Sequence, residues 1–193
     1  MCWAMFNIWE QSHYPDDALP RPNTFDAEQN KLSKDSKVPV ESDPDIVLTK
    51  PDKNLYPIYP VEGDNIGTLT IPALKRTIPI LQGTGDNELK KGVGHFSQSV
   101  LPGEGDNCVI SGHRETVFRG IGNLKIGDRV IIKTSAGTFT YEVRETRIVH
   151  ADDKTVIVPT DNAVLTMTTC YPFNFIGSAP DRYIVSADLV KNK

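Results

Sequence analysis

Short hydrophobic runs rich in β-branched residues recur along the chain from Ile66 onward, separated by glycine, proline, asparagine and aspartate. Runs of this length between turn-forming residues are typical of β-strands. The pattern predicts strands over Ile66–Ile71, Ile78–Leu81, Cys108–Ser111, Val130–Thr134, Thr138–Val149, Thr155–Val158, Val164–Thr169 and Tyr183–Val190.

Two of these runs alternate with a period of two, as a strand does when its two faces differ. Phe139, Tyr141 and Val143 share one face of their run, and Leu165 and Met167 share one face of theirs. About eight strands in roughly 130 residues favour a closed barrel, which leaves no exposed sheet edge. We therefore predict an all-β fold, a closed eight-stranded β-barrel with one to three short helices.

Helical pattern is scarce in the same region. The segment Asp86–Lys91 is expected to form one capped turn, with Asp86 as its N-cap and Gly92 as its stop. A second short helix is expected over Glu115–Leu124.

The first third of the chain has a different composition. All 14 glycines lie at or after Gly63, whereas eight of the 14 prolines lie in residues 1–60. These 60 residues hold 10 acidic and 6 basic side chains, and the remainder holds 15 of each. A polar, proline-rich stretch buries too little apolar surface to offset its ordering entropy. We predict an irregular, acidic N-terminal extension over residues 1–55 and a folded domain over residues 56–193.

The apolar start of this extension, Met1–Trp9, is too short to span a bilayer. It is interpreted either as the remnant of a longer membrane anchor or as a short piece that docks on the domain. The net charge of −4 comes entirely from the extension, and nothing in the balanced domain indicates a nucleic-acid partner.

Three residues are candidates for chemistry: His113, Cys170 and Arg182. Cys170 ends an alternating run, and Pro172 should stop the strand pairing there, which would leave the thiol at the mouth of the barrel. Arg182 opens the next run, so the two residues would face each other if these strands are neighbours. Taken singly, each residue is more simply explained as an ordinary structural side chain.

Together, the three residues suit covalent catalysis. A Cys–His pair can form a thioester with a peptide carbonyl, and a permanently charged guanidinium can stabilise the oxyanion or hold the substrate backbone. A zinc site built from Cys108, His113 and Cys170 is disfavoured, because no C-x-x-C or H-x-x-x-H pair supports it.

The motifs around these residues resemble those of sortases. The family's T-L-x-T-C strand end, its arginine at the start of the next strand and its upstream Gly-His pair correspond to Leu165–Cys170, Arg182 and Gly112–His113. Further correspondences are Ile66–Pro72, Ile78–Leu81 and Gly94–Ser99, the last with His95 as a non-catalytic histidine. The resemblance covers residues 62–190, and the stretch Thr168–Val185 is most similar to class D sortases of Gram-positive bacilli.

The resemblance implies a sortase-type β-barrel and a two-step transpeptidation. Cys170 would attack the threonine carbonyl of an L-P-x-T-x sorting signal, typically L-P-N-T-A in this class. The acyl-enzyme would then pass to an amine of lipid II or of a peptidoglycan cross-bridge. The expected location is the extracytoplasmic face of the cell membrane, although this chain contains no anchor segment. Its expected partners are surface proteins that carry the signal.

Further site residues follow from the resemblance and from simple chemistry. The backbone N–H of Tyr171 is a candidate oxyanion donor, and Thr169 is interpreted either as a substrate contact or as a plain β-former. An apolar groove for the leucine and proline of the signal would use Ile148, Val156 and Val158, which are equally consistent with core positions. We predict no metal or other cofactor, although calcium stimulation through loop carboxylates remains open, with candidates at Glu104, Asp106, Asp152 and Asp153.

Two other functions use the same sequence features. A cysteine peptidase would hydrolyse the same peptides with water as acceptor. A non-enzymatic barrel would bind a peptide by strand addition and would not need Cys170.

Overall fold

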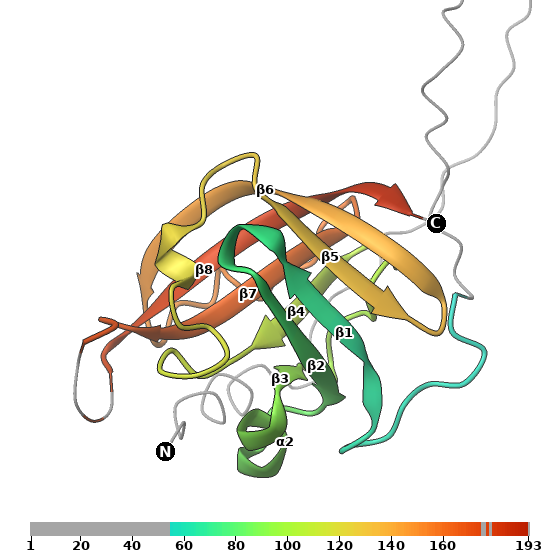
Figure 1. Cartoon of the computed structure of the whole chain (residues 1–193), viewed down its shortest axis with the longest axis horizontal. Coiled ribbons are helices and arrows are strands. Elements are labelled where there is room, and N and C mark those ends of the chain that lie inside the picture. The colour runs from blue at the N-terminus through green and yellow to red at the C-terminus, as the bar shows by residue number, and fades with distance from the viewer. Residues whose placement is uncertain (1–54, 175–176, 178, 193) are drawn as a thin grey trace, which may run out of the picture.

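The computed structural model describes residues 55–174, 177 and 179–192 (Figure 1). The predicted extension therefore lies, except for Leu55, outside the described residues, as does its apolar start. Tyr56, at the start of the folded domain, is buried, and its hydroxyl donates a hydrogen bond to the carbonyl oxygen of Pro102 at 2.7 Å.

The described residues fold into a closed barrel of eight strands, in the order β1-β2-β3-β4-β7-β8-β6-β5 (Figure 1). The prediction of an all-β, eight-stranded closed barrel is confirmed. The strands are β1 (Asn65–Ile71), β2 (Arg76–Gln82), β3 (Val93–His95), β4 (Asn107–Ser111), β5 (Arg129–Thr134), β6 (Gly137–His150), β7 (Val164–Tyr171) and β8 (Asp181–Asn192).

Three short helices interrupt the strands of the described chain: η1 (Pro72–Leu74), α2 (Asp86–Lys91) and η2 (Ile121–Asn123). The bounds of α2 agree with the prediction, and Gly92 ends it by donating its N–H to the carbonyl oxygen of Glu88. The predicted N-cap is wrong, because Gly85 occupies that position and no side chain caps the helix.

The segment Glu115–Leu124 does not form one helix. It makes a series of turns followed by the three residues of η2. Gly120 separates the two parts because it adopts the left-handed conformation, with φ 84°, which a continuous right-handed helix does not allow.

One predicted strand is wrong and one strand was missed. Thr155–Val158 lies in the loop between β6 and β7, where Asp153 Oδ1 accepts hydrogen bonds from both the N–H and the hydroxyl of Thr155. Side-chain partners of this kind compete with strand pairing. The missed strand, β3, has only three residues and owes its pairing to β2 and β4 on either side.

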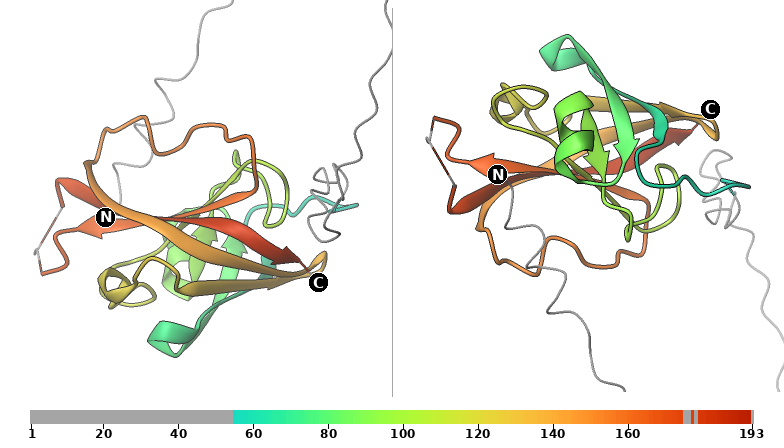
Figure 2. Two further views of the ribbon diagram at one scale, coloured as in Figure 1. Left: turned by 90° about the horizontal axis from the view of Figure 1, so that it is seen from above. Right: turned by 90° about the horizontal axis from the view of Figure 1, so that it is seen from below.

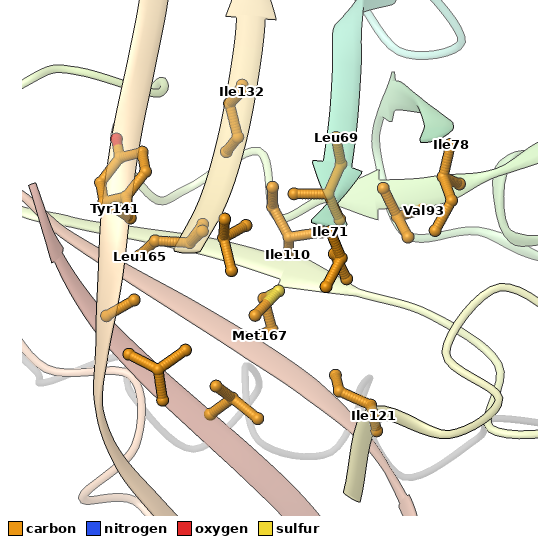
Figure 3. Packing of buried hydrophobic residues seen from close by; sticks show 14 of the residues in the cluster. Leu69, Ile71, Ile78, Val93, Ile110, Ile121, Ile132, Tyr141, Leu165 and Met167 are labelled. Atoms are coloured by element: carbon orange, nitrogen blue, oxygen red, sulfur yellow. The ribbon is translucent and has the colours of Figure 1, made fainter. Parts of the chain in front are cut away.

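The barrel interior is filled by alternate residues of the strands (Figure 3). Phe139, Tyr141 and Val143 of β6 all point into this core, as their alternation predicts. Leu165 and Met167 of β7 are fully buried there as well, beside Ile110 of β4. The odd-numbered positions of β7 therefore face inward, and the even-numbered positions Thr166, Thr168 and Cys170 face outward.

The topology gathers three strand ends at one end of the barrel. Strand β4 runs parallel to β7, so their carboxyl ends coincide, with Ser111 beside Thr168. Strand β8 runs antiparallel to β7, so it begins where β7 ends. The loop between β6 and β7 arches over one side of the barrel, visible in orange in the left panel of Figure 2.

Candidate active site

Cys170 and Arg182 are direct partners across the antiparallel ladder of β7 and β8. Opposed residues in such a ladder project to the same face of the sheet, with Cβ atoms about 5 Å apart. The structure thus places Cys170 and Arg182 side by side on the outer face of the barrel. Val149 of β6 follows in the same row, since it pairs with Arg182 from the other side.

The guanidinium of Arg182 is held by the backbone of its own turn. The side chain is buried, and Nη1 donates to the carbonyl oxygens of Ala179 at 3.1 Å and Asp181 at 2.8 Å. Within the described chain no carboxylate forms an ion pair with this arginine. Among the described residues, no carboxylate therefore neutralises the positive charge that lies beside Cys170.

His113 follows β4 in a loop that is bonded to β7. The Gly112 N–H donates to the Thr168 carbonyl oxygen at 3.2 Å, and the Thr169 hydroxyl donates to the Gly112 carbonyl oxygen at 2.7 Å. These two bonds continue the pairing of β4 with β7 for one residue beyond Ser111. His113, whose ring is half-buried, therefore enters its loop next to the end of β7 that carries Cys170.

Gly112 is needed at this junction for close packing. A Cβ at this position would lie 2.7 Å from Cδ2 of Phe118 and 2.8 Å from Cγ2 of Val117. Both contacts are shorter than ordinary van der Waals separations, and Phe118 is fully buried. The glycine lets the loop of His113 lie directly against the barrel.

A small pocket joins the thiol and the guanidinium. It lies between α2 and the ends of β4 and β7, where β8 begins. Its lining residues are Thr84, Leu89, Ser111, Gly112, Thr168, Thr169, Cys170 and Arg182. Cys170 is half-buried at this pocket, whereas burial in the core raises the pKa of the Cys108 thiol far above its ordinary value. Cys108 is therefore held as the neutral thiol and is unsuited to nucleophilic attack.

Arg114, immediately after His113, bonds to the loop between β7 and β8. Its Nη1 donates to the carbonyl oxygen of Pro172 at 3.1 Å, and its Nη2 donates to that of Gly177 at 3.3 Å. Its Nε pairs with Glu115 at 2.6 Å; although partial burial opposes the effect, this bond and charge lower the pKa of the Glu115 carboxyl. Arg114 was not among the predicted site residues, although it directly follows His113.

Comparison with known proteins identifies the family. The family model for the sortase domain matches residues 69–190. The chain is 44% identical to Sortase D of Bacillus subtilis (strain 168) over 134 residues, which cover 69% of this chain and 68% of that protein. The chain belongs to the sortase family.

Solved sortase structures have the same fold. A Sortase D5 transpeptidase of Clostridium perfringens superimposes with a TM-score of 0.62 at 32% identity, over 68% of this chain and 82% of that one. Sortase A of Corynebacterium diphtheriae gives a TM-score of 0.62 at 31% identity, over 67% and 62% of the two chains. The sequence resemblance is thus confirmed, and this protein is a cysteine transpeptidase.

Sortases anchor surface proteins and act at the outer side of the membrane. No helix among the described residues is long and apolar enough to cross one.

His95, the histidine expected to be non-catalytic, is enclosed within the protein. Its ring is buried, with Nδ1 2.8 Å from Gln82 Oε1 and Nε2 2.9 Å from the Val100 carbonyl oxygen. Burial lowers the pKa of this imidazole, which favours the neutral ring in the folded protein.

Two of the predicted substrate residues, Thr169 and Tyr171, lie on either side of Cys170 in β7. The Thr169 hydroxyl is bonded to Gly112. The ring of Tyr171 packs edge-on against Phe173, with centroids 5.3 Å apart, and stacks on Tyr183 at 6.3 Å. The candidate oxyanion donor of Tyr171 is its backbone N–H, which lies at the last paired position of β7, opposite Asp181 of β8.

The three apolar candidates lie farther away. Ile148 is exposed on β6, opposite Tyr183. Val156, which is buried, and Val158, which is exposed, lie in the loop between β6 and β7 and contact Asn107 at the start of β4. Asn107 lies beside Thr166 of β7. Thr166 comes four residues before Cys170, a separation of about 13 Å along an extended strand.

Glu104 and Asp106, two of the carboxylates considered for calcium, accept hydrogen bonds from other groups of the protein. Glu104 accepts from the Tyr59 hydroxyl and the Leu101 N–H, and Asp106 accepts from two backbone N–H groups. Cys108, considered for zinc, faces the barrel interior, away from Cys170. Over the described part of the chain, no three histidine, cysteine or acidic side chains are grouped to hold a metal ion.

Proposed function

We propose that this sortase cleaves an L-P-x-T-x sorting signal after its threonine, with Cys170 as the nucleophile, and joins the threonine to an amine of the cell wall. The signal proposed is L-P-N-T-A, on the basis of the resemblance to class D sortases. The amine is proposed to belong to lipid II or to a peptidoglycan cross-bridge. The observation that supports this proposal is the direct opposition of Cys170 and Arg182 at the barrel end that the loop of His113 joins.

In the first step, the Cys170 thiolate attacks the carbonyl carbon of the threonine. The carbonyl oxygen becomes an oxyanion, which the Arg182 guanidinium and the Tyr171 N–H stabilise. The C–N bond then breaks, and the leaving amine takes a proton from the His113 imidazolium. The product is a thioester between the threonine and Cys170.

In the second step, the amine of the cell-wall precursor attacks the thioester carbonyl. His113, now neutral, takes the proton that this amine loses. The C–S bond breaks, the Cys170 thiolate is released, and a new amide bond joins the surface protein to the wall. Arg182 serves both steps because its charge does not depend on pH in the working range.

The test is incubation of the protein with an L-P-N-T-A peptide and a primary-amine acceptor. Mass spectrometry should detect an acyl-enzyme on Cys170 and an amine-linked peptide product. Cys170→Ala should abolish both, and Cys108→Ala, at the buried thiol, should retain them. Absence of an acyl-enzyme on correctly folded protein would sink the proposal. Hydrolysed peptide as the sole product, at saturating amine, would instead favour the cysteine peptidase.

A further inference from the structure

Asn107, the first residue of β4, bonds to two other parts of the barrel through its side chain. Its Nδ2 donates to the carbonyl oxygens of Val156 and Val158, both at 3.2 Å. Its Oδ1 accepts a hydrogen bond from the hydroxyl of Thr166 at 2.7 Å. Asn107 and Thr166 are almost completely buried, so this amide has its donors and its acceptor committed to protein groups.

The neighbouring residue Asp106 reinforces the same attachment. Its Oδ1 accepts from the N–H of Thr160 and from the N–H of Asn107, both at 2.7 Å. Its carbonyl oxygen accepts from the N–H of Val164, where β7 begins. The loop between β6 and β7, residues 151–163, is thus tied to the start of β4 by three side-chain bonds.

The attachment lies on the face of the barrel that carries Cys170. Thr166, Thr168 and Cys170 are alternate residues of β7 and project to the same outer face. The bond from Thr166 to Asn107 places the tied segment Val156–Val158 over that face. The separation from Thr166 to Cys170, about 13 Å, is also the length of four residues of extended peptide.

We propose that Asn107 is a positioning residue that fixes the loop 151–163 as one wall of the peptide-binding surface. In a sorting signal whose threonine carbonyl lies at Cys170, the leucine is three positions before the threonine, and the four residues L-P-x-T together span the separation to the tied segment. Val156 and Val158 then offer that leucine an apolar contact. Asn107 acts by preorganising this wall, because a loop that is already ordered costs less entropy on binding. This role rests on the proposed function, since it concerns the same peptide.

The test compares Asn107→Asp with Asn65→Asp. The first variant keeps the size of the side chain and the acceptor for Thr166, but it places an oxygen where Nδ2 donates to two carbonyl groups. The second makes the same chemical change at an exposed residue that also opens a strand, β1, outside the loop, and it keeps the acceptor for the Gly67 N–H. A third variant, Thr166→Val, removes the hydroxyl that orients the amide and serves if Asn107→Asp does not fold.

We expect hydrogen exchange of the amides in Val156–Thr160 to accelerate by about tenfold in Asn107→Asp, because about two hydrogen bonds are lost. The KM for an L-P-N-T-A peptide should rise about tenfold with kcat changed by less than about threefold, the pattern of lost ground-state binding. Alkylation of Cys170 by iodoacetamide, which needs no peptide contact, should keep its wild-type rate. Asn65→Asp should behave as wild type in all three measurements.

Wild-type exchange in Asn107→Asp and Thr166→Val would overturn the attachment. Faster exchange with an unchanged KM would overturn the role of the loop in peptide binding. If the wild-type protein forms no acyl-enzyme at all, the proposed function fails, and the exchange comparison still decides whether Asn107 orders the loop.

Discussion

The hydroxyl of Thr169 donates a hydrogen bond to the carbonyl oxygen of Gly112, 2.7 Å away. Thr169 precedes Cys170 on β7, and Gly112 precedes His113 after β4. The bond therefore joins the residue before the proposed nucleophile to the residue before the proposed acid, and so holds the two backbone segments together. Because this hydrogen bond is buried, water does not compete for its donor or its acceptor.

Thr169→Val should lower kcat about tenfold, since it frees the loop of His113 relative to Cys170 while keeping the shape of the side chain. The free energy of unfolding should fall by only about 1 kcal/mol. Peptide turnover and urea denaturation measure the two effects. The matched control is Thr70→Val, which breaks a surface hydroxyl contact with Thr77 at 3.1 Å and should leave kcat unchanged. An unchanged kcat in Thr169→Val would show that this bond does not position the site.

Arg182→Lys should reduce kcat/KM at least about 100-fold, although the charge is conserved. A lysine ammonium lacks the planar fork through which Nη1 bonds to the carbonyl oxygens of Ala179 and Asp181, so the charge opposite Cys170 would not be held in the same place. Peptide turnover measures the loss, and circular dichroism checks the fold. Arg144→Lys, at an exposed ion pair with Asp188, is the control and should keep wild-type activity. Near-normal activity in Arg182→Lys would mean that charge alone suffices.

The buried imidazole of His95 should make the protein less stable in mild acid. Burial lowers its pKa in the folded state below the ordinary value of 6.5. The unfolded chain therefore binds more protons as the pH falls below about 6.5, and stability declines until the pH reaches the folded-state pKa. Above about pH 6.5 this contribution is fully present.

Urea denaturation between about pH 7.5 and about pH 5 measures this decline. His95→Gln removes the titrating group, so its stability should depend less on pH over this range, even if the variant is less stable at neutral pH. An equally steep decline in His95→Gln would contradict the assignment to His95.

Gly103→Ala should destabilise the barrel strongly. Gly103 has φ +91°, and a Cβ there would lie 2.1 Å from Cε1 of the buried Phe139. Left-handed strain and overpacking together should cost about 3 kcal/mol. Gly127→Ala is the matched control: it has φ +90° with no atom within 4 Å of the added Cβ, so it should cost about 1 kcal/mol. Equal losses of unfolding free energy in the two variants would exclude the clash with Phe139.

Most of the barrel was predictable from local pattern. Seven of the eight predicted runs form strands, because β-branched residues alternate between turn-forming residues over enough length to be recognised. The exceptions are short. β3 has three residues and is a strand only because β2 and β4 flank it, and Thr155–Val158 has strand-like composition but bonds to side chains of Asp153 and Asn107.

The candidate site was predictable only in part. Cys170 and Arg182 are recognisable because each lies at the end of a strand and matches a family motif. Arg114 and Asn107 were missed, because an arginine after a histidine and an asparagine before a strand have no distinctive pattern. Their roles depend on carbonyl groups that lie at Pro172, Gly177, Val156 and Val158, more than 40 residues away in sequence.

The sequence alone determined the fold class, the family and the three residues proposed for chemistry, since period-two alternation and short motifs are local properties of the chain. Tertiary structure decided the strand order, the pairing of Cys170 with Arg182 and the bonds that hold the loops around them. Those features depend on hydrogen bonds between residues far apart in sequence. Such bonds form only when the closed barrel brings β4, β7 and β8 together, and no local pattern encodes which distant carbonyl group a side chain will meet.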